Sequence, residues 1–162
     1  ASGGVMEAAL RTVTDVLTKE DLTNLDYHAV RGEEGVKEAS LKIGDMTVNV
    51  AVAHSMVLAK PLLEEIKNGT SKYHFIEIMG CPGGCVNGGG QSYVNALTRN
   101  SGFDWKQARA KALYDEDLAL PVRKSHKNSQ IQKLYADFLG EPNSEKAHHL
   151  LHTHYTRKER FK

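Results

Sequence analysis

The sequence is poor in the features that mark secreted, membrane-bound or nucleic-acid-binding proteins. Its 162 residues include only two cysteines, too few for the disulfide framework of a small secreted protein. No stretch approaches the roughly 20 continuous apolar residues of a membrane span. Lys and Arg number 21 against 20 Asp and Glu, so the net charge of +1 gives no electrostatic reason to expect nucleic acid or a membrane surface as a partner.

What is present is an ordinary globular composition, 40% apolar and 25% charged, sufficient for one domain that buries roughly two-thirds of its unfolded surface. Residue 1 is Ala rather than Met, and a helix-like stretch follows at once over residues 4–11. We therefore expect a piece of a longer protein or a processed subunit. Signals missing from such an end say little about localisation, and the cytoplasm is the location we favour.

The hydrophobic spacing predicts an α/β core. Residues 4–17 carry apolar residues every three or four positions, as on the buried face of a helix, with Ser2 as its candidate cap. Alternating strands are expected between residues 36 and 53, joined by a turn at Gly44-Asp45. A helix over 54–68 then leads to a strand over 73–79, and Pro61 within the helix predicts a kink or a start later than the spacing suggests. Strand, helix and strand in this order predict a βαβ crossover.

The remainder reads as helical. Helices are expected at about 104–118, 128–139 and 144–155, capped by Asp104, Asn128 and Ser144. The predicted architecture is a small mixed sheet flanked by helices, with a helical C-terminal third that wraps over the sheet without forming a second domain.

The chemistry is concentrated in residues 80–91, where the sequence reads GCPGGCVNGGGQ and holds six of the 14 glycines together with both cysteines, Cys81 and Cys85. Each glycine costs conformational entropy on folding, so the concentration needs a cause. Tight turns, close approach of a bound group, and several N–H groups aimed at an anion are three such causes. A thiolate-bound iron–sulfur cluster would use all three.

Other interpretations remain open from spacing alone. The glycines lack the Gly-Lys-Ser or Gly-Lys-Thr of a phosphate loop and the spacing of a dinucleotide fingerprint. Three residues separate the cysteines, whereas a thioredoxin-type pair has two. A zinc site built from the two cysteines with His148 and His152, spaced i and i+4 on a predicted helix, is another alternative. A purely structural glycine loop with two idle thiols is the remaining alternative.

Residues 75–91, FIEIMGCPGGCVNGGGQ, closely resemble a signature of the iron-only (FeFe) hydrogenases. Residues 3–11, 120–126 and 148–155 resemble further characteristic stretches of that family, in family order. The resemblance covers essentially the whole chain. It implies that residues 1–162 correspond to the C-terminal half of the catalytic domain, one lobe of a two-lobed structure.

The resemblance also implies a cofactor and roles for single residues. These enzymes interconvert H2 with protons and electrons at the H-cluster, a 4Fe–4S cubane linked by one thiolate to a di-iron unit that carries CO, CN and a dithiolate bridge. On this resemblance Cys81 is a cubane ligand and Cys85 bridges the cubane to the di-iron unit. Met79, Val5 and Gly84 belong to the cofactor-binding pocket.

The departures from the family are equally informative. The family's first two signatures, which supply two more cubane cysteines, are absent from this sequence, and so is the cysteine that relays protons to the di-iron unit. No catalytic residue is therefore assigned on this chain, and the chain alone is expected to be inactive. The missing N-terminal half of the domain, or a second subunit, would complete the site. A non-catalytic relative that holds a simple iron–sulfur cluster for assembly or sensing is the alternative function.

Electron-transfer partners are less well defined. The His-rich ending is similar to that of large bacterial hydrogenases with NADH-linked or formate-linked subunits, and ferredoxin is equally compatible. Arg123, Lys124 and Lys127 are most simply a solvated basic face, with docking of an acidic ferredoxin as the functional alternative. Glu77, which faces opposite to its neighbours in the strand, is expected to form a buried ion pair with a Lys or Arg.

Overall fold

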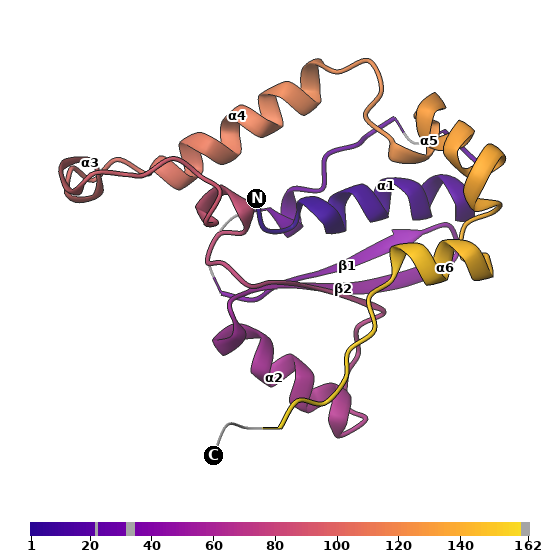
Figure 1. Ribbon diagram of the computed structural model, residues 1–162, viewed down its shortest axis with the longest axis horizontal. Coiled ribbons are helices and arrows are strands. Elements are labelled where there is room, and N and C mark those ends of the chain that lie inside the picture. The colour runs from indigo at the N-terminus through magenta and orange to yellow at the C-terminus, as the bar shows by residue number, and fades with distance from the viewer. Residues whose placement is uncertain (22, 32–34, 160–162) are drawn as a thin grey trace. The chain divides into compact units, whose positions relative to one another are not determined.

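A three-stranded sheet with one helix on each face organises the first part of the chain (Figure 1). The computed structural model describes residues 1–21, 23–31 and 35–159, which fall into two compact units that divide after Arg123. The elements of the first unit are α1 (Gly4–Thr18), η1 (His28–Val30), β1 (Lys37–Ile43), β2 (Met46–His54), α2 (Met56–Lys67), β3 (Phe75–Met79), η2 (Cys85–Asn87), α3 (Ala96–Asn100) and α4 (Trp105–Ala119).

The sheet is mixed, with the strand order β1-β2-β3. β1 and β2 form an antiparallel hairpin whose turn contains Gly44 at a φ of +59°, a conformation that glycine adopts without strain. β2 and β3 are parallel and are joined through α2, with Val50 opposite Phe75 and His54 opposite Met79. The predicted hairpin and βαβ crossover are both confirmed.

The core lies on both faces of β2, the central strand. On one face Val50 and Val52 pack with Met6 and Leu10 of α1. On the other face Ala51 and Ala53 pack with Leu62 of α2, an arrangement visible in Figure 1 as α1 and α2 on opposite sides of the sheet. Burial on both faces explains why this strand reads as a nearly continuous apolar run.

Two expectations about element ends are wrong, and the later start allowed for the helix containing Pro61 is confirmed. Ser2 does not cap α1, because the N-cap position is Gly3, which has no side-chain atom that could accept a hydrogen bond. α2 begins at Met56 rather than at residue 54, since His54 extends β2, and the helix continues through Pro61. The last helix ends at Leu151 instead of residue 155.

The second compact unit starts at Lys124 and is helical. It contains η3 (Ser125–Lys127), α5 (Ser129–Leu134), the π-helical turn η4 (Tyr135–Leu139) and α6 (Glu145–Leu151). The side chains of Asn128 and Ser144 accept hydrogen bonds from the first turns of α5 and α6, as expected. In the first unit Asp104 caps α4 in the same way. That the C-terminal helices wrap over the sheet stays a prediction.

Candidate functional site

The glycine loop, residues 80–91, begins where β3 ends and lies beside the end of β2. The backbone N–H of Ser55, just after β2, donates a 2.7 Å hydrogen bond to the carbonyl of Met79. Ser55 has a φ of +78° and a ψ of 152°, a conformation that residues with a side chain rarely adopt. The loop therefore starts at the carboxyl ends of two parallel strands, where α/β proteins commonly bind ligands.

Both cysteines in the loop are free and exposed. The loop fixes their positions by backbone hydrogen bonds: the Gly84 N–H donates to the Cys81 carbonyl at 2.9 Å, and the Gly88 N–H donates to the Cys85 carbonyl at 3.0 Å. The two sulfurs are not joined in a disulfide and are not enclosed in the apolar core. They are accessible to a metal or cluster from outside.

Five of the six loop glycines fall into two groups, and the sixth, Gly88, would bring a side-chain carbon 3.3 Å from the Cys85 carbonyl oxygen. Gly83 and Gly84 are buried and have positive φ. A side-chain carbon at Gly84 would lie 2.6 Å from the backbone nitrogen of Ser2, so Gly84 permits close contact with the start of the chain. Gly80, Gly89 and Gly90, in contrast, would meet nothing within 4 Å. Packing of the described chain does not require glycine at these three positions, whereas close approach of a bound group would.

The start of the chain is fastened to this loop and to β3. The Ser2 N–H donates to the Gly83 carbonyl at 3.0 Å. The carboxylate of Glu77 accepts hydrogen bonds from the N–H of Gly3 at 2.7 Å and from that of Met6 at 2.6 Å. The expected ion pair of Glu77 is therefore corrected: its bonding partners are backbone amides at the first turn of α1, which also bear the positive end of the helix dipole.

These ties bring the predicted pocket residues to one end of the sheet. Met79 is half-buried at the end of β3, and Val5 lies in the first turn of α1 with 58% of its surface exposed. The Ser2 side chain is fully buried, and its hydroxyl has no hydrogen-bond partner among the described residues. The assignment of Val5, Met79 and Gly84 to a cofactor stays a prediction.

Arg109 of α4 donates hydrogen bonds to the glycine loop and to the residue that follows it. Its guanidinium donates to the Val86 carbonyl at 2.9 Å and to the Ser92 carbonyl at 2.6 Å. The same guanidinium lies 5.0 Å from the centre of the Trp105 ring, within range of a cation–π contact. The sequence reasoning missed Arg109, since nothing in the helix pattern shows which loop an arginine will reach.

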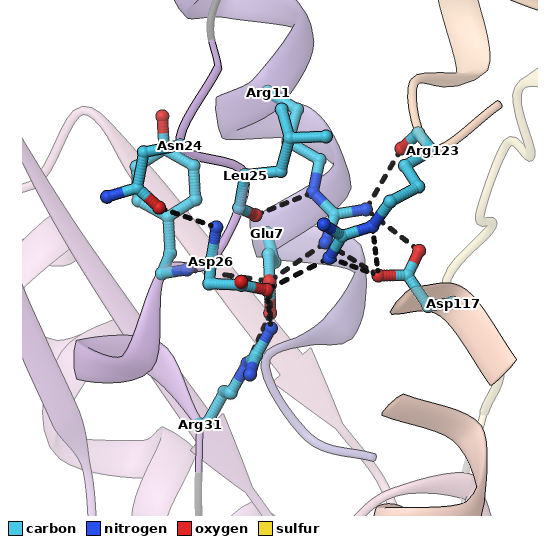
Figure 2. A network of polar contacts seen from close by, with 9 residues as sticks. Glu7, Arg11, Asn24, Leu25, Asp26, Arg31, Asp117 and Arg123 are labelled. Carbon is cyan, nitrogen blue, oxygen red and sulfur yellow. Dashed lines mark hydrogen bonds and ion pairs between the residues drawn. The ribbon is translucent and has the colours of Figure 1, made fainter. Parts of the chain in front are cut away.

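Two residues of α1, Glu7 and Arg11, belong to a closed ring of alternating charges. Figure 2 shows the hydrogen bonds and ion pairs of this ring. Going round, each residue contacts the next: Glu7, Arg11, Asp117, Arg123, Asp26 and Arg31, which returns to Glu7. Its three acids and three arginines balance. We call these six residues the charge ring.

The solvated basic face expected of Arg123, Lys124 and Lys127 is wrong for the first two residues, whereas Lys127 is exposed as expected. The Arg123 side chain is only 14% exposed and binds both Asp26 and Asp117. Lys124 is buried as well. The pKa of Asp26 is lowered, chiefly by the hydrogen bond from Arg123, and that of Asp117 chiefly by the hydrogen bond from Arg11.

The donor set fits part of an iron–sulfur site. Cys81 and Cys85 supply two accessible thiols, the ligand type that iron–sulfur clusters use. Among the described residues up to 123, no three His, Cys, Asp or Glu side chains gather as a metal-binding group. A four-iron cubane held by four cysteines would therefore need ligands from outside this chain.

The histidine arrangement expected for a zinc site is wrong in one respect. His148 lies on α6, but His152 is the residue that ends this helix and is not part of it. Their rings contact edge to face with centroids 4.3 Å apart. The i, i+4 helical pair that motivated a zinc site is therefore absent from α6.

Two family models match the chain. The model described as "Iron only hydrogenase large subunit, C-terminal domain" matches residues 1–89, and "Iron hydrogenase small subunit" matches residues 104–158. The first of them alone covers more than half of the sequence. This chain belongs to the iron-only hydrogenase family.

Individual relatives agree. The NADP-reducing hydrogenase subunit HndD of Solidesulfovibrio fructosivorans is 45% identical over 160 residues, and iron hydrogenase 1 of Clostridium pasteurianum is 44% identical over 158. The alignments cover 99% and 96% of this chain but only 26% and 27% of those proteins. A solved structure of a variant of the FeFe hydrogenase HydA1 of Chlamydomonas reinhardtii matches with a TM-score of 0.71 and 37% identity, over 96% of this chain and 45% of that one.

This chain is also similar in sequence to proteins with other names. Human nuclear prelamin A recognition factor is 30% identical over 161 residues, covering 99% of this chain and 34% of that protein. The cytosolic Fe-S cluster assembly factor narfl of Danio rerio is 30% identical over 154 residues, covering 95% and 36%. In the described part of the chain, no helix is both long and apolar enough to cross a bilayer.

Proposed function

We propose that residues 1–162 form the C-terminal lobe of an iron-only hydrogenase catalytic domain, which interconverts H2 with protons and electrons. The observation that carries the proposal is the pair of free, exposed thiols in a glycine loop at the carboxyl end of β3. The glycines without neighbours at positions 80, 89 and 90 leave room for a bulky group beside them. The family membership supports the H-cluster as that group.

The residues of this chain have distinct roles in the proposal. Cys81 ligates the 4Fe–4S cubane, and Cys85 bridges the cubane to the di-iron unit. Met79 and Val5 line the di-iron pocket, where apolar side chains exclude water from the open iron. Gly84 lets the loop pack against Ser2 and so fixes the spacing of the two thiols.

The partner in this proposal is the polypeptide segment that supplies the cubane ligands this chain lacks. The remaining cubane cysteines come from the N-terminal half of the domain or from a second subunit, which covers the face bearing Cys81 and Cys85. Electrons then pass to ferredoxin or to an NADH-linked or formate-linked subunit. The shares of the relatives' lengths covered by this chain support a partner domain of at least similar size.

The test uses the complete protein, matured with its iron centres. Infrared spectroscopy should show CO and CN bands, and iron analysis should show at least the iron of one cubane and one di-iron unit. Cys85→Ser should lose the CO and CN bands and hydrogen turnover, because the oxygen cannot replace the bridging thiolate. Met46→Ser, an exposed residue at the opposite end of β2, is the control and should keep both. Hydrogen turnover retained by Cys85→Ser would refute the role of Cys85.

A second function is favoured by the prelamin A recognition factor and cluster-assembly relatives. In that case the loop holds a simple iron–sulfur cluster without a di-iron unit, and the protein acts in assembly or sensing. The same infrared measurement separates the two functions. An iron–sulfur absorption without CO or CN bands in a maturation-competent preparation would favour the second one.

A further inference from the structure

Glu77 is a buried carboxylate on β3 whose bonding differs from that of an ordinary buried acid. It is 7% exposed. One oxygen accepts from the N–H of Gly3, the N-cap of α1, and the other accepts from the N–H of Met6 in the first turn. These are the two amides that a capping box satisfies with two side chains of the helix itself. Here a single carboxylate from a strand 71 and 74 residues away accepts from both.

The helix cannot cap itself because of the residue at its N-cap. Gly3 has a φ of +93°, and a side-chain carbon there would lie 1.9 Å from the carbonyl oxygen of Val30. The Ser, Thr, Asp or Asn that ordinarily caps a helix is therefore excluded at this position. Buried backbone N–H groups require a partner, and Glu77 supplies it.

The same contacts determine how the proposed pocket walls are placed. Val5 lies between the two amides that Glu77 binds, in the first turn of α1. Met79 follows Glu77 by two residues and, because side chains alternate along a strand, projects on the same face of β3. Ser2, one residue before Gly3, bonds to Gly83 between the two cysteines. Together with the Ser2–Gly83 hydrogen bond, the Glu77 carboxylate sets the first turn of α1 against the strand and loop bearing Met79, Cys81 and Cys85.

We propose that Glu77 is a positioning residue: by holding the amides of Gly3 and Met6 it fixes the Val5 wall relative to Met79 and the two cysteines. The inference rests on the proposed function for what occupies the pocket. The placement of the first turn of α1 against β3, in contrast, is set by contacts within this chain and does not depend on the occupant of the pocket. Glu77 contacts neither the reacting atoms nor the cluster in this role.

The first experiment needs no cofactor. In the complete protein without its iron centres, Glu77→Gln preserves the size of the side chain but points an amide NH2 at one of the two backbone N–H donors. Hydrogen bonds to a charged group contribute more than neutral ones, so exchange of the amides at residues 3–6 should speed up roughly tenfold or more. Thiol-reagent kinetics at Cys81 and Cys85 should change as well, because Ser2 and Gly83 move together.

Glu7→Gln is the matched control. Glu7 is a buried carboxylate on the same helix, one turn further on, and it bonds to Arg11 and Arg31 rather than to β3 or the loop. This variant should lower overall stability while leaving amide exchange at residues 3–6 and the thiol kinetics near those of the parent. Equal behaviour of Glu77→Gln and Glu7→Gln would overturn the proposal.

The second experiment uses the matured protein. Glu77→Gln should shift or broaden the CO and CN infrared bands, whereas Glu7→Gln should leave their positions unchanged. If Glu77→Gln speeds up amide exchange at residues 3–6 but leaves the CO and CN bands unchanged, Glu77 only caps the helix, and its positioning role is overturned. A parent protein without any CO or CN bands would instead refute the proposed function. The amide-exchange data would still show whether Glu77 holds the first turn of α1 against β3. If Glu77→Gln fails to fold, Glu77→Asp, which keeps the charge but reaches less far, takes its place.

Discussion

At the residue scale, neighbouring glycines at the start of α1 have different reasons to be glycine. Gly3 combines a φ of +93° with a backbone oxygen that would lie 1.9 Å from a side-chain carbon, whereas Gly4 has no atom within 4 Å of that position. The backbone therefore requires glycine at position 3, whereas packing and backbone conformation do not require it at position 4.

Gly3→Ala should therefore destabilise the protein, and Gly4→Ala should not. The left-handed backbone of residue 3 alone costs an alanine about 1–3 kcal/mol, and the clash with Val30 adds to it. Gly4→Ala should be neutral or stabilise by up to about 1 kcal/mol, because alanine restricts the unfolded chain. Urea unfolding of the two variants checks this, and a similar loss of stability in both would contradict it.

At the scale of elements, the charge ring joins α1, the segment before β1 and the end of α4. Its carboxylates at Asp26 and Asp117 have lowered pKa values because arginines donate hydrogen bonds to them. Glu7, enclosed between Arg11 and Arg31 at 3% side-chain exposure, anchors the ring in the interior. Removing one partner of a buried pair leaves the other charge uncompensated.

The lowered pKa values predict an acid-sensitive fold. A carboxyl group whose folded pKa lies below its unfolded value stabilises the fold above the unfolded pKa, and the effect is lost as the pH falls through the folded pKa. The free energy of unfolding should therefore fall as the pH drops below about 4. Asp117→Asn should flatten this dependence.

Denaturant unfolding over a series of pH values measures this dependence. Asp115→Asn is the control, because the Asp115 side chain is 61% exposed and pairs only with exposed Lys111 among the ion pairs shown by the structure. An exposed pair of this kind contributes little, so its slope should match that of the parent. If Asp117→Asn also kept the parent slope, the charge ring would not be the source of the acid sensitivity.

At the scale of the whole molecule, the two family models leave a gap between residues 89 and 104. Much of this gap is exposed, including Tyr93 at 82% and Leu97 at 84%. α4, beyond the gap, is nevertheless joined to the first 92 residues by Arg109 and by the ion pair between Arg11 and Asp117.

The complete protein divided between Asn100 and Ser101 should therefore reassemble from two polypeptides. The hydrogen bonds and the ion pair that join α4 to the glycine loop and to α1 do not depend on the peptide bond between Asn100 and Ser101. Co-expression followed by affinity purification through one piece should recover the other, and Arg109→Ala combined with Asp117→Ala should reduce the recovery. Pieces of the parent sequence that separate during size-exclusion chromatography would contradict the prediction.

Local patterns in the sequence were enough to predict the hairpin at Gly44-Asp45, the crossover from β2 to β3, and the caps at Asp104, Asn128 and Ser144. These features depend on residues close together in the chain: the alternation of side chains along a strand, the conformational freedom of one glycine, or a side-chain oxygen within three residues of an amide. Cys81 and Cys85 were also identified as candidate ligands at this level, because both the glycine concentration and the family signature are local.

Tertiary structure alone decided the partners of Glu77, Arg109 and Arg123. Each of these side chains could have met solvent, an ion pair or a backbone group, and the outcome depends on which distant segment packs beside it. Glu77 binds amides because Gly3, constrained by Val30, leaves α1 without a cap of its own. Arg123 is enclosed because Asp26 and Asp117 approach from segments far apart in the chain, and no local spacing encodes that approach.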